Sequence, residues 1–152
     1  AITAAGSGKV ELIDLELHRG EALLRPLVER IRQEGAKVIV SCHDFEKTPP
    51  REEMNRLFCS MQQLGGDITK LAVMPSSRRD VLALLEASVD LEEGLADRPF
   101  IAISMGSLGT ISRMAAQFTG SALTFASAGK SSAPGQASAG GMRTALQMLN
   151  RM

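Results

Sequence analysis

The feature that most constrains the fold is a regular alternation of short β-like runs with longer stretches of helical periodicity. Strands are predicted at residues 10–17, 37–41, 68–73, 100–104 and 123–125. Helices are predicted at residues 21–33, from an N-cap at Thr48 followed by Pro49 to the glycine pair 65–66, and after a capping Ser77, with Leu82 among the residues that face inward. Two more are predicted at about 111–118 and at the end of the chain to about 149. This order predicts an α/β fold with a parallel sheet, either doubly wound or part of a (β/α)8 barrel.

Polar and small residues on the predicted strands favour the barrel. A doubly wound sheet is apolar on both faces, whereas a barrel interior that holds a reaction site carries polar groups. The strand residues expected on the face away from the helices are Asp14, Glu16, Ser41, Lys70 and Ser104. About five βα units cannot close an eight-stranded barrel, so we expect the 152 residues to form a single domain that is a partial (β/α)8 barrel.

Composition excludes several classes of function. Seventeen basic and seventeen acidic residues cancel, and there is no Trp or Tyr, which argues against nucleic-acid or membrane-surface binding. Cys42 and Cys59 have no zinc-ligand spacing and are expected to be reduced thiols of a cytoplasmic protein. No apolar run has the length of a membrane span, and the first residues lack signal-peptide regions. A small-molecule partner is the better expectation.

Lys70 is the most informative residue because it lies in the middle of the predicted strand 68–73. An amine held in a low-dielectric interior loses its proton more easily and then attacks a carbonyl to form a Schiff base. The alternative is that Lys70 lies at a sheet edge or reaches outward to solvent.

His43 follows the strand 37–41, where active-site residues of parallel α/β folds collect. One strand–helix–strand repeat separates it from Lys70, so the two are expected on neighbouring strands. An imidazole there suits general acid–base catalysis. The alternative is a loop histidine beside Asp44, which would cap backbone amides. His18, after the first strand, is a weaker candidate for the same role.

The glycine- and serine-rich segment 126–138 is long for a strand–helix connection and is predicted to be a mobile lid. Its Gly-Lys-Ser does not complete a phosphate-binding loop, because Thr124 stands where glycine is required. Arg113, after the fourth strand, is a candidate to bind a carboxylate through a bidentate guanidinium. The alternative for this residue is a solvated helix face.

Several motifs together resemble one family. The segments VSCHDFEKTP, ITKLAVMPSS, ISMGSLGTISRMA, GSALTFAS and SSAPGQAS are similar, in order and spacing, to type I 3-dehydroquinate dehydratase. The similarity runs from VELIDLEL to the C-terminus. It implies a (β/α)8 barrel, a homodimer, and a hydro-lyase of the shikimate pathway of aromatic amino acid biosynthesis, which converts 3-dehydroquinate to 3-dehydroshikimate.

The resemblance also implies roles for individual residues. Lys70 matches the imine-forming lysine and His43 the general acid–base. Arg113 resembles the arginine that binds the substrate carboxylate, and Ser132 and Gln136 resemble lid residues that hydrogen-bond substrate hydroxyls. No metal or cofactor is implied. Cys42 is expected to line the site beside His43.

One departure from the family pattern stands out. Strands expected ahead of VELIDLEL, with a Glu-x-Arg segment and a further arginine, have no counterpart in this sequence. We therefore expect a C-terminal portion of the enzyme that alone is poorly folded, or is completed by other protein. The alternatives are an inactive or interaction-only fragment, and another imine-forming lyase of the aldolase type.

Overall fold

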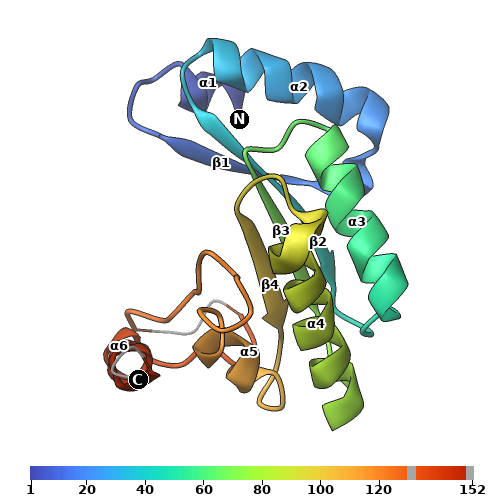
Figure 1. The fold of residues 1–152 in the computed structure, drawn as a ribbon. Coiled ribbons are helices and arrows are strands. Elements are labelled where there is room, and N and C mark those ends of the chain that lie inside the picture. Colours follow the sequence, from blue (N-terminus) through green and yellow to red (C-terminus); the bar gives the residue numbers. More distant parts are fainter. Residues whose placement is uncertain (130–132, 150–152) are drawn as a thin grey trace.

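The computed structural model describes residues 1–129 and 133–149. The sheet in this part of the chain has four parallel strands in sequential order: β1 (Leu12–Glu16), β2 (Lys37–Asp44), β3 (Ile68–Val73) and β4 (Phe100–Ser104). The α-helices are α1 (Ile2–Ala5), α2 (Glu21–Gln33), α3 (Arg51–Gln63), α4 (Arg78–Asp90), α5 (Thr110–Met114) and α6 (Ala139–Leu149), with short helical turns η1 (Leu17–Arg19) and η2 (Leu91–Leu95). The α/β class and the parallel sheet are as predicted (Figure 1).

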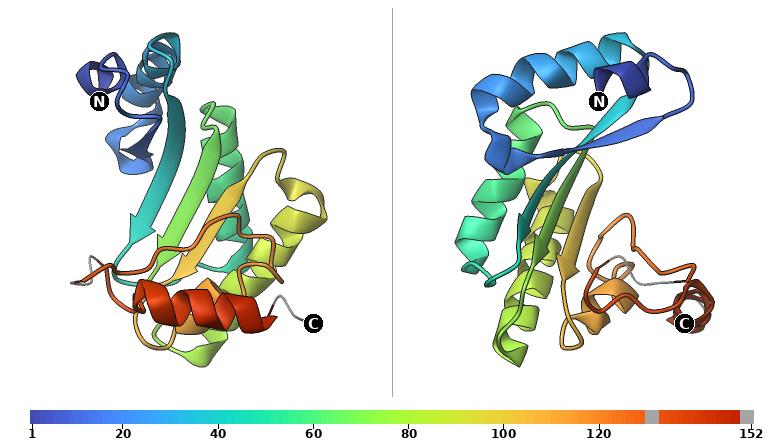
Figure 2. Two further views of the ribbon diagram at one scale, coloured as in Figure 1. Left: turned by 90° about the vertical axis from the view of Figure 1, so that its left-hand side faces the viewer. Right: turned by 180° about the vertical axis from the view of Figure 1, so that it is seen from behind.

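Helices α2, α3 and α4 cover one face of the sheet and build the main core with it (Figures 1 and 2). Apolar residues at helical spacing supply the helix side of this core, and alternate strand residues supply the sheet side. Phe58 of α3 and Phe100 of β4 meet edge-on with ring centroids 5.9 Å apart. Ser77 caps α4 and forms a capping box with Asp80, as the sequence predicts.

The other face of the sheet carries the polar strand residues. The register places Glu16 opposite Ser41, Ser41 opposite Lys70, and Lys70 opposite Ile101 in one row across four strands. The segment after α5 and helix α6 lie in front of this face, at the carboxyl ends of the strands (Figure 2, left). The segment after α5 and the open face of the sheet therefore face each other at this end of the strands.

Two predicted elements differ in the structure. Residues 123–125 form no strand. Just before them, Ala122 N donates a main-chain hydrogen bond to Phe100 O of β4. The next amide of β4 that faces this segment, Ala102 N, donates to the Ser121 hydroxyl instead of to a main-chain carbonyl. The predicted N-cap Thr48 is also wrong. Helix α3 begins at Arg51, because Thr48 donates its hydroxyl to Met74 O instead.

Two side chains point to the opposite side from the one predicted. Ser104 pairs with Val73, which belongs to the helix-side core, so Ser104 faces the helices and its amide donates to Ser112 Oγ. Leu82 of α4, predicted to face inward, is 56% exposed because the sheet contacts of α4 are made by residues such as Val81 and Leu84.

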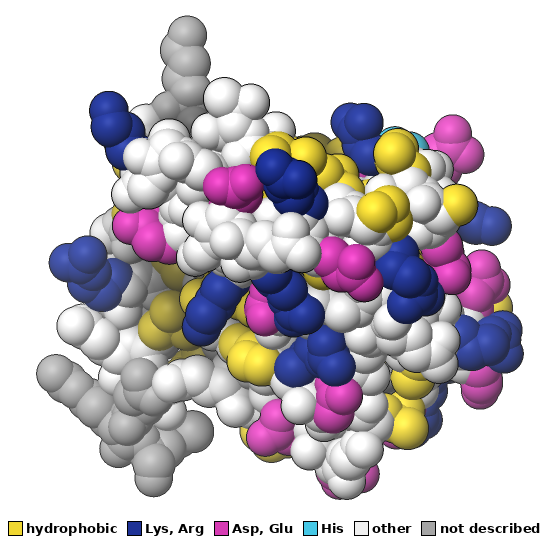
Figure 3. Space-filling view, turned by 90° about the horizontal axis from the view of Figure 1, so that it is seen from above, with side chains coloured by type: hydrophobic (Ala, Val, Ile, Leu, Met, Phe, Trp, Pro, Cys, Tyr) yellow, Lys and Arg dark blue, Asp and Glu magenta, His cyan; other side chains and the backbone are white. Residues whose placement is uncertain are grey.

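Basic and acidic side chains intermingle on the face seen from above the strands' amino ends (Figure 3). This distribution agrees with the balanced charge of the sequence. Among the described residues, every helix is too short or too polar to cross a membrane.

Candidate active site

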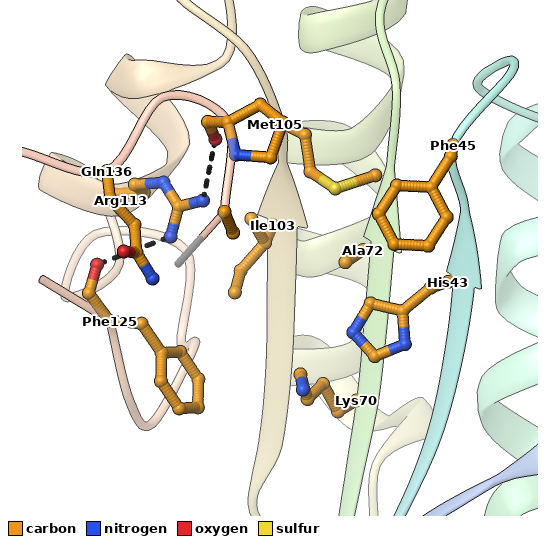
Figure 4. Close-up of a pocket in the computed structure, with 11 residues that line it drawn as sticks. His43, Phe45, Lys70, Ala72, Ile103, Met105, Arg113, Phe125 and Gln136 are labelled. Atoms are coloured by element: carbon orange, nitrogen blue, oxygen red, sulfur yellow. Dashed lines mark hydrogen bonds between the residues drawn. The ribbon is translucent and has the colours of Figure 1, made fainter. Parts of the chain in front are cut away.

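A cavity of about 270 Å³ lies between the open face of the sheet and the segment after α5 (Figure 4). Its floor comes from β2, β3 and β4, and its opposite wall comes from Phe125 and residues 133–136. The lining includes four of the five residues that the sequence predicts to be catalytic or substrate-binding: Lys70, His43, Arg113 and Gln136. The parallel strands β2 and β3 place His43 and Lys70 side by side, and α5, which follows β4, brings Arg113 to the same cavity.

Lys70 points from the centre of β3 into this cavity, and its side chain is 11% exposed. Its Nζ lies 2.9 Å from Asp14 Oδ2 and 5.2 Å from the centroid of the Phe125 ring. The alternative of a lysine that reaches out to solvent is therefore wrong. Lys70 combines a nucleophilic nitrogen with a carboxylate that balances positive charge on it.

His43 lies inside β2, which extends to Asp44, rather than in the loop after the strand. Its Nδ1 is 2.6 Å from Glu16 Oε2, its main-chain N donates to Glu16 Oε1, and its ring stacks on Phe45. An ionised carboxylate only accepts hydrogen bonds, so a neutral His43 carries its proton on Nδ1 and keeps Nε2 as a base. Asp44 does cap the next turn, accepting from the amides of residues 46 and 47.

Three further site residues, Asp14, Glu16 and Ser41, were predicted to face away from the helices but were given no role from the sequence. Ser41 is fully buried, and its Oγ lies 2.5 Å from Asp14 Oδ1 and 3.2 Å from Glu16 Oε2. The available signal was parity: Asp14 and Glu16 share one face of the first strand, and Ser41 shares a face with His43. Only the register between strands places these three residues next to His43 and Lys70.

Arg113 is 2% exposed, so the alternative of a solvated helix face is wrong. Its Nη atoms donate to the carbonyl oxygens of Phe125 and Pro134 at 3.4 and 3.3 Å, and its buried Nε has no hydrogen-bond partner among the residues that the structure describes (Figure 4). Burial lowers the pKa of this guanidinium from its ordinary value. A buried cation with a donor left over is suited to binding an anionic group.

The segment that closes the cavity is held against the end of β4 by two glycines. Gly106 N donates to Pro134 O at 3.2 Å, and a Cβ on Gly135 would lie 2.2 Å from Gly106 O. Ser127 and Ser138 form a β-bridge at the base of the segment. Of the predicted substrate-binding residues here, Gln136 lines the cavity, and Ser132 lies outside the described residues.

Two other candidates lie away from the cavity. The Cys42 side chain packs against the helix-side core, so the expectation that it lines the site is wrong. Burial, with Glu16 and Asp44 nearby, raises the pKa of its thiol. His18 is largely exposed and meets Glu16 Oε1 at 3.5 Å.

Comparisons with known proteins, by sequence and by structure, point to one family. The family model for type I 3-dehydroquinase matches residues 1–152. The chain is 46% identical over 146 residues to a 3-dehydroquinate dehydratase of Syntrophotalea carbinolica, covering 96% of this chain and 58% of the relative. It is 47% identical over 148 residues to that of Salmonella paratyphi B, covering 97% and 59%.

Solved structures show the same likeness. A type I 3-dehydroquinate dehydratase from Clostridium difficile, covalently modified by comenic acid, has a TM-score of 0.94 and 43% identity, over 99% of this chain and 59% of that one. The enzyme from Geobacillus kaustophilus gives 0.94 and 38%, over 99% and 58%. The chain thus spans less than two thirds of these relatives, and its sheet corresponds to part of a (β/α)8 barrel. It belongs to the type I 3-dehydroquinase family.

Proposed function

We propose that this chain carries the catalytic residues of a hydro-lyase that dehydrates 3-dehydroquinate to 3-dehydroshikimate. The observation that carries the proposal is that the Lys70 amine, the His43 imidazole and the Arg113 guanidinium line one cavity. A nucleophilic amine, an acid–base group and an anion-binding group are the three parts that this reaction requires of a protein.

The chemistry balances without a cofactor. The unprotonated Lys70 amine attacks the substrate ketone, and loss of water with uptake of one proton from solvent gives a protonated imine. This proton is returned to solvent when the imine is hydrolysed to the free amine. His43 Nε2 removes the proton adjacent to the imine carbon, and the electron pair moves to the imine nitrogen to give an enamine. The enamine expels the β-hydroxyl, which leaves as water with the proton from His43. Hydrolysis of the imine consumes one water, frees Lys70 and leaves the net loss of one water from the substrate.

The other cavity residues are proposed to hold the substrate. Arg113 binds its carboxylate, using the Nε that is left without a hydrogen-bond partner in the described part of the chain. Gln136 and Ser132 hydrogen-bond its hydroxyls, as the resemblance implies. Phe45 and Phe125 add apolar surface to the cavity lining, which limits water at the imine.

We also propose how the protein is assembled and where it acts. The four strands act as part of a larger barrel, which the free outer edge of β1 and the greater length of the relatives support. A homodimer is supported by the family resemblance, and by an apolar groove at the protein surface that is lined by exposed Leu82 and Phe118. The unpaired thiols of Cys42 and Cys59 support a cytoplasmic location.

The test is intact-mass spectrometry after incubation with 3-dehydroquinate and borohydride, followed by peptide mapping. Two proteins are compared: this chain, and a hybrid in which the part of the Syntrophotalea carbinolica relative that this chain does not span is joined to it. We expect one reduced adduct, on Lys70, and none in Lys70→Arg. Arginine keeps the positive charge beside Asp14 but does not form the imine.

The possible outcomes distinguish activity of this chain alone from activity that needs the completed barrel. An adduct and turnover in both proteins support the proposal for the chain as it stands. An adduct and turnover only in the hybrid assign the activity to the completed barrel. An adduct on another residue, or none in a folded hybrid, overturns the proposal.

A further inference from the structure

The two groups proposed to do the chemistry are joined by a continuous line of short polar contacts. Lys70 Nζ donates to Asp14 Oδ2 at 2.9 Å, and Asp14 Oδ1 accepts from Ser41 Oγ at 2.5 Å. Ser41 Oγ also lies 3.2 Å from Glu16 Oε2, which in turn is 2.6 Å from His43 Nδ1. The line crosses β3, β1 and β2, and its ends both reach the cavity.

The middle of this line holds fewer protons than acceptors. The Ser41 hydroxyl has one proton, and two carboxylates lie within hydrogen-bonding distance of its oxygen. With both carboxylates ionised, the hydroxyl donates to only one of them at a time. Ser41 is fully buried, so no solvent molecule is at hand to supply the missing donor at its oxygen.

The charge on Lys70 decides which carboxylate attracts this proton more strongly. A protonated Lys70, or a protonated imine on the same nitrogen, neutralises Asp14 and leaves Ser41 free to donate to Glu16. A neutral amine leaves Asp14 uncompensated, so Ser41 donates to Asp14, and Glu16 keeps only its contacts with His43. Glu16 then stabilises positive charge on His43 more strongly.

We propose that Asp14, Ser41 and Glu16 are positioning residues that hold Lys70 and His43 in place and couple the charge on Lys70 to the basicity of His43. This proposal rests on the proposed imine chemistry for its purpose. It gives the single histidine a means to change from base to acid as the nitrogen of Lys70 changes state. None of the three residues needs to touch the substrate for this role.

The coupling is measured by nuclear magnetic resonance of the histidine rings. The chain has only two histidines, so His18→Gln assigns the His43 ring unambiguously. Removing the Lys70 charge with Lys70→Met raises the pH midpoint of His43, directly through space and also through Ser41. In a Ser41→Ala background only the direct part remains, so we expect the shift to fall to about half or less.

Several charged groups around His43 are common to all these variants, so their effects cancel in the comparison. They lie on β1, η1, β2 and α5, and are Asp14, Glu16, His18, Arg19, Asp44 and Arg113. Ser88→Ala is the matched control, because Ser88 is a buried serine whose hydroxyl donates to Leu84 O within α4. Ser41→Cys, which keeps a weak donor of similar size, replaces Ser41→Ala if the latter does not fold.

Kinetics of the hybrid give a second readout. Ser41→Ala is expected to lower kcat about tenfold, the change typical of one lost hydrogen bond to a charged group, with KM within about twofold. The borohydride adduct on Lys70 still forms, and Ser41→Thr, which restores the hydroxyl, recovers most of the lost kcat. A purely structural role would lower the melting temperature without this split between kcat and KM.

The coupling through Ser41 and the proposed dehydratase function can be disproved independently of each other. An equal shift of the His43 midpoint in the wild-type and Ser41→Ala backgrounds overturns the coupling, even if the protein is an active dehydratase. A hybrid without adduct or turnover overturns the proposed function, while the ring titrations still decide whether Ser41 couples the two groups.

Discussion

Glu16 Oε2 lies 2.6 Å from His43 Nδ1, so that the carboxylate of one strand orients the imidazole of the next. A second contact, from His43 N to Glu16 Oε1 at 2.8 Å, ties the same carboxylate to the backbone of β2. The imidazole therefore has a defined ring orientation, with Nε2 available to the cavity that also holds Lys70. Predictions about the site follow from this arrangement.

Replacing His43 separates imine formation from turnover. In the hybrid, His43→Ala is expected to lower kcat by about a hundredfold or more, the usual contribution of a general acid–base group. Lys70 still supplies the nucleophile, so borohydride still traps an adduct there. Steady-state kinetics and intact mass check this, and loss of the Lys70 adduct in a folded His43→Ala protein would show that His43 acts earlier than proposed.

Arg113 is expected to affect substrate binding rather than chemistry. Arg113→Met removes a buried cation and should raise KM for 3-dehydroquinate about tenfold or more, because a hydrogen-bonded charge pair with the substrate is lost. The melting temperature should not fall, since burial of this charge opposes folding. Arg79→Met, at an exposed arginine of α4, is the control. An unchanged KM would contradict the carboxylate assignment.

The close approach of two glycines predicts a strong effect from one methyl group. Gly135 has φ +76°, and a Cβ there would lie 2.2 Å from Gly106 O. Gly135→Ala should displace the cavity wall from the end of β4, raise KM and speed proteolytic cleavage in the segment after α5. Gly129→Ala, where a Cβ meets nothing within 4 Å, is the matched control. Equal behaviour of the two variants would show that the glycine contact does not hold the wall.

The Cys42 thiol gives a pH-dependent test of the position of its side chain. Burial first, and then the charges of Glu16 and Asp44, raise its pKa above the ordinary value of 9.0. Since the thiolate is the reactive form, alkylation of Cys42 at pH 8 should be slower than that of glutathione, and should still be increasing above pH 9. Iodoacetamide labelling followed by peptide mapping measures this. Rapid labelling at pH 7 would place the thiol in the open cavity instead.

Much of the fold could be predicted because each strand and helix has a strong local pattern. The capping box of Ser77 with Asp80, and the helix 21–33, are local features and were found. The fifth strand was not, because residues 123–125 have a β-like composition but only one main-chain bond holds the segment beside β4. Pairing with a neighbouring strand is not a property of a segment by itself.

The site residues also differ in whether the local sequence identifies them. Lys70 and His43 could be found from their unusual chemistry on or beside strands, and Arg113 from its place after the fourth strand. The roles of Ser41 and the two β1 carboxylates depend on register, which no single strand encodes. Ser104 was predicted to face away from the helices but faces them. An error of one residue in the alternation inferred for a strand is enough to move a side chain to the other face.

Side chains alternate between the two faces of these strands, so neighbouring residues contribute in turn to the core and to the cavity. In β3, Leu71 and Val73 belong to the core beneath the helices, whereas Lys70 between Thr69 and Leu71 faces the cavity. A single-residue deletion within the strand would exchange these tasks along the rest of the strand, placing an ammonium group under the helices and leucine in the cavity. A substitution in this sheet therefore acts on one face at a time, whereas an insertion or deletion inside a strand keeps both faces only when it comes as two residues together.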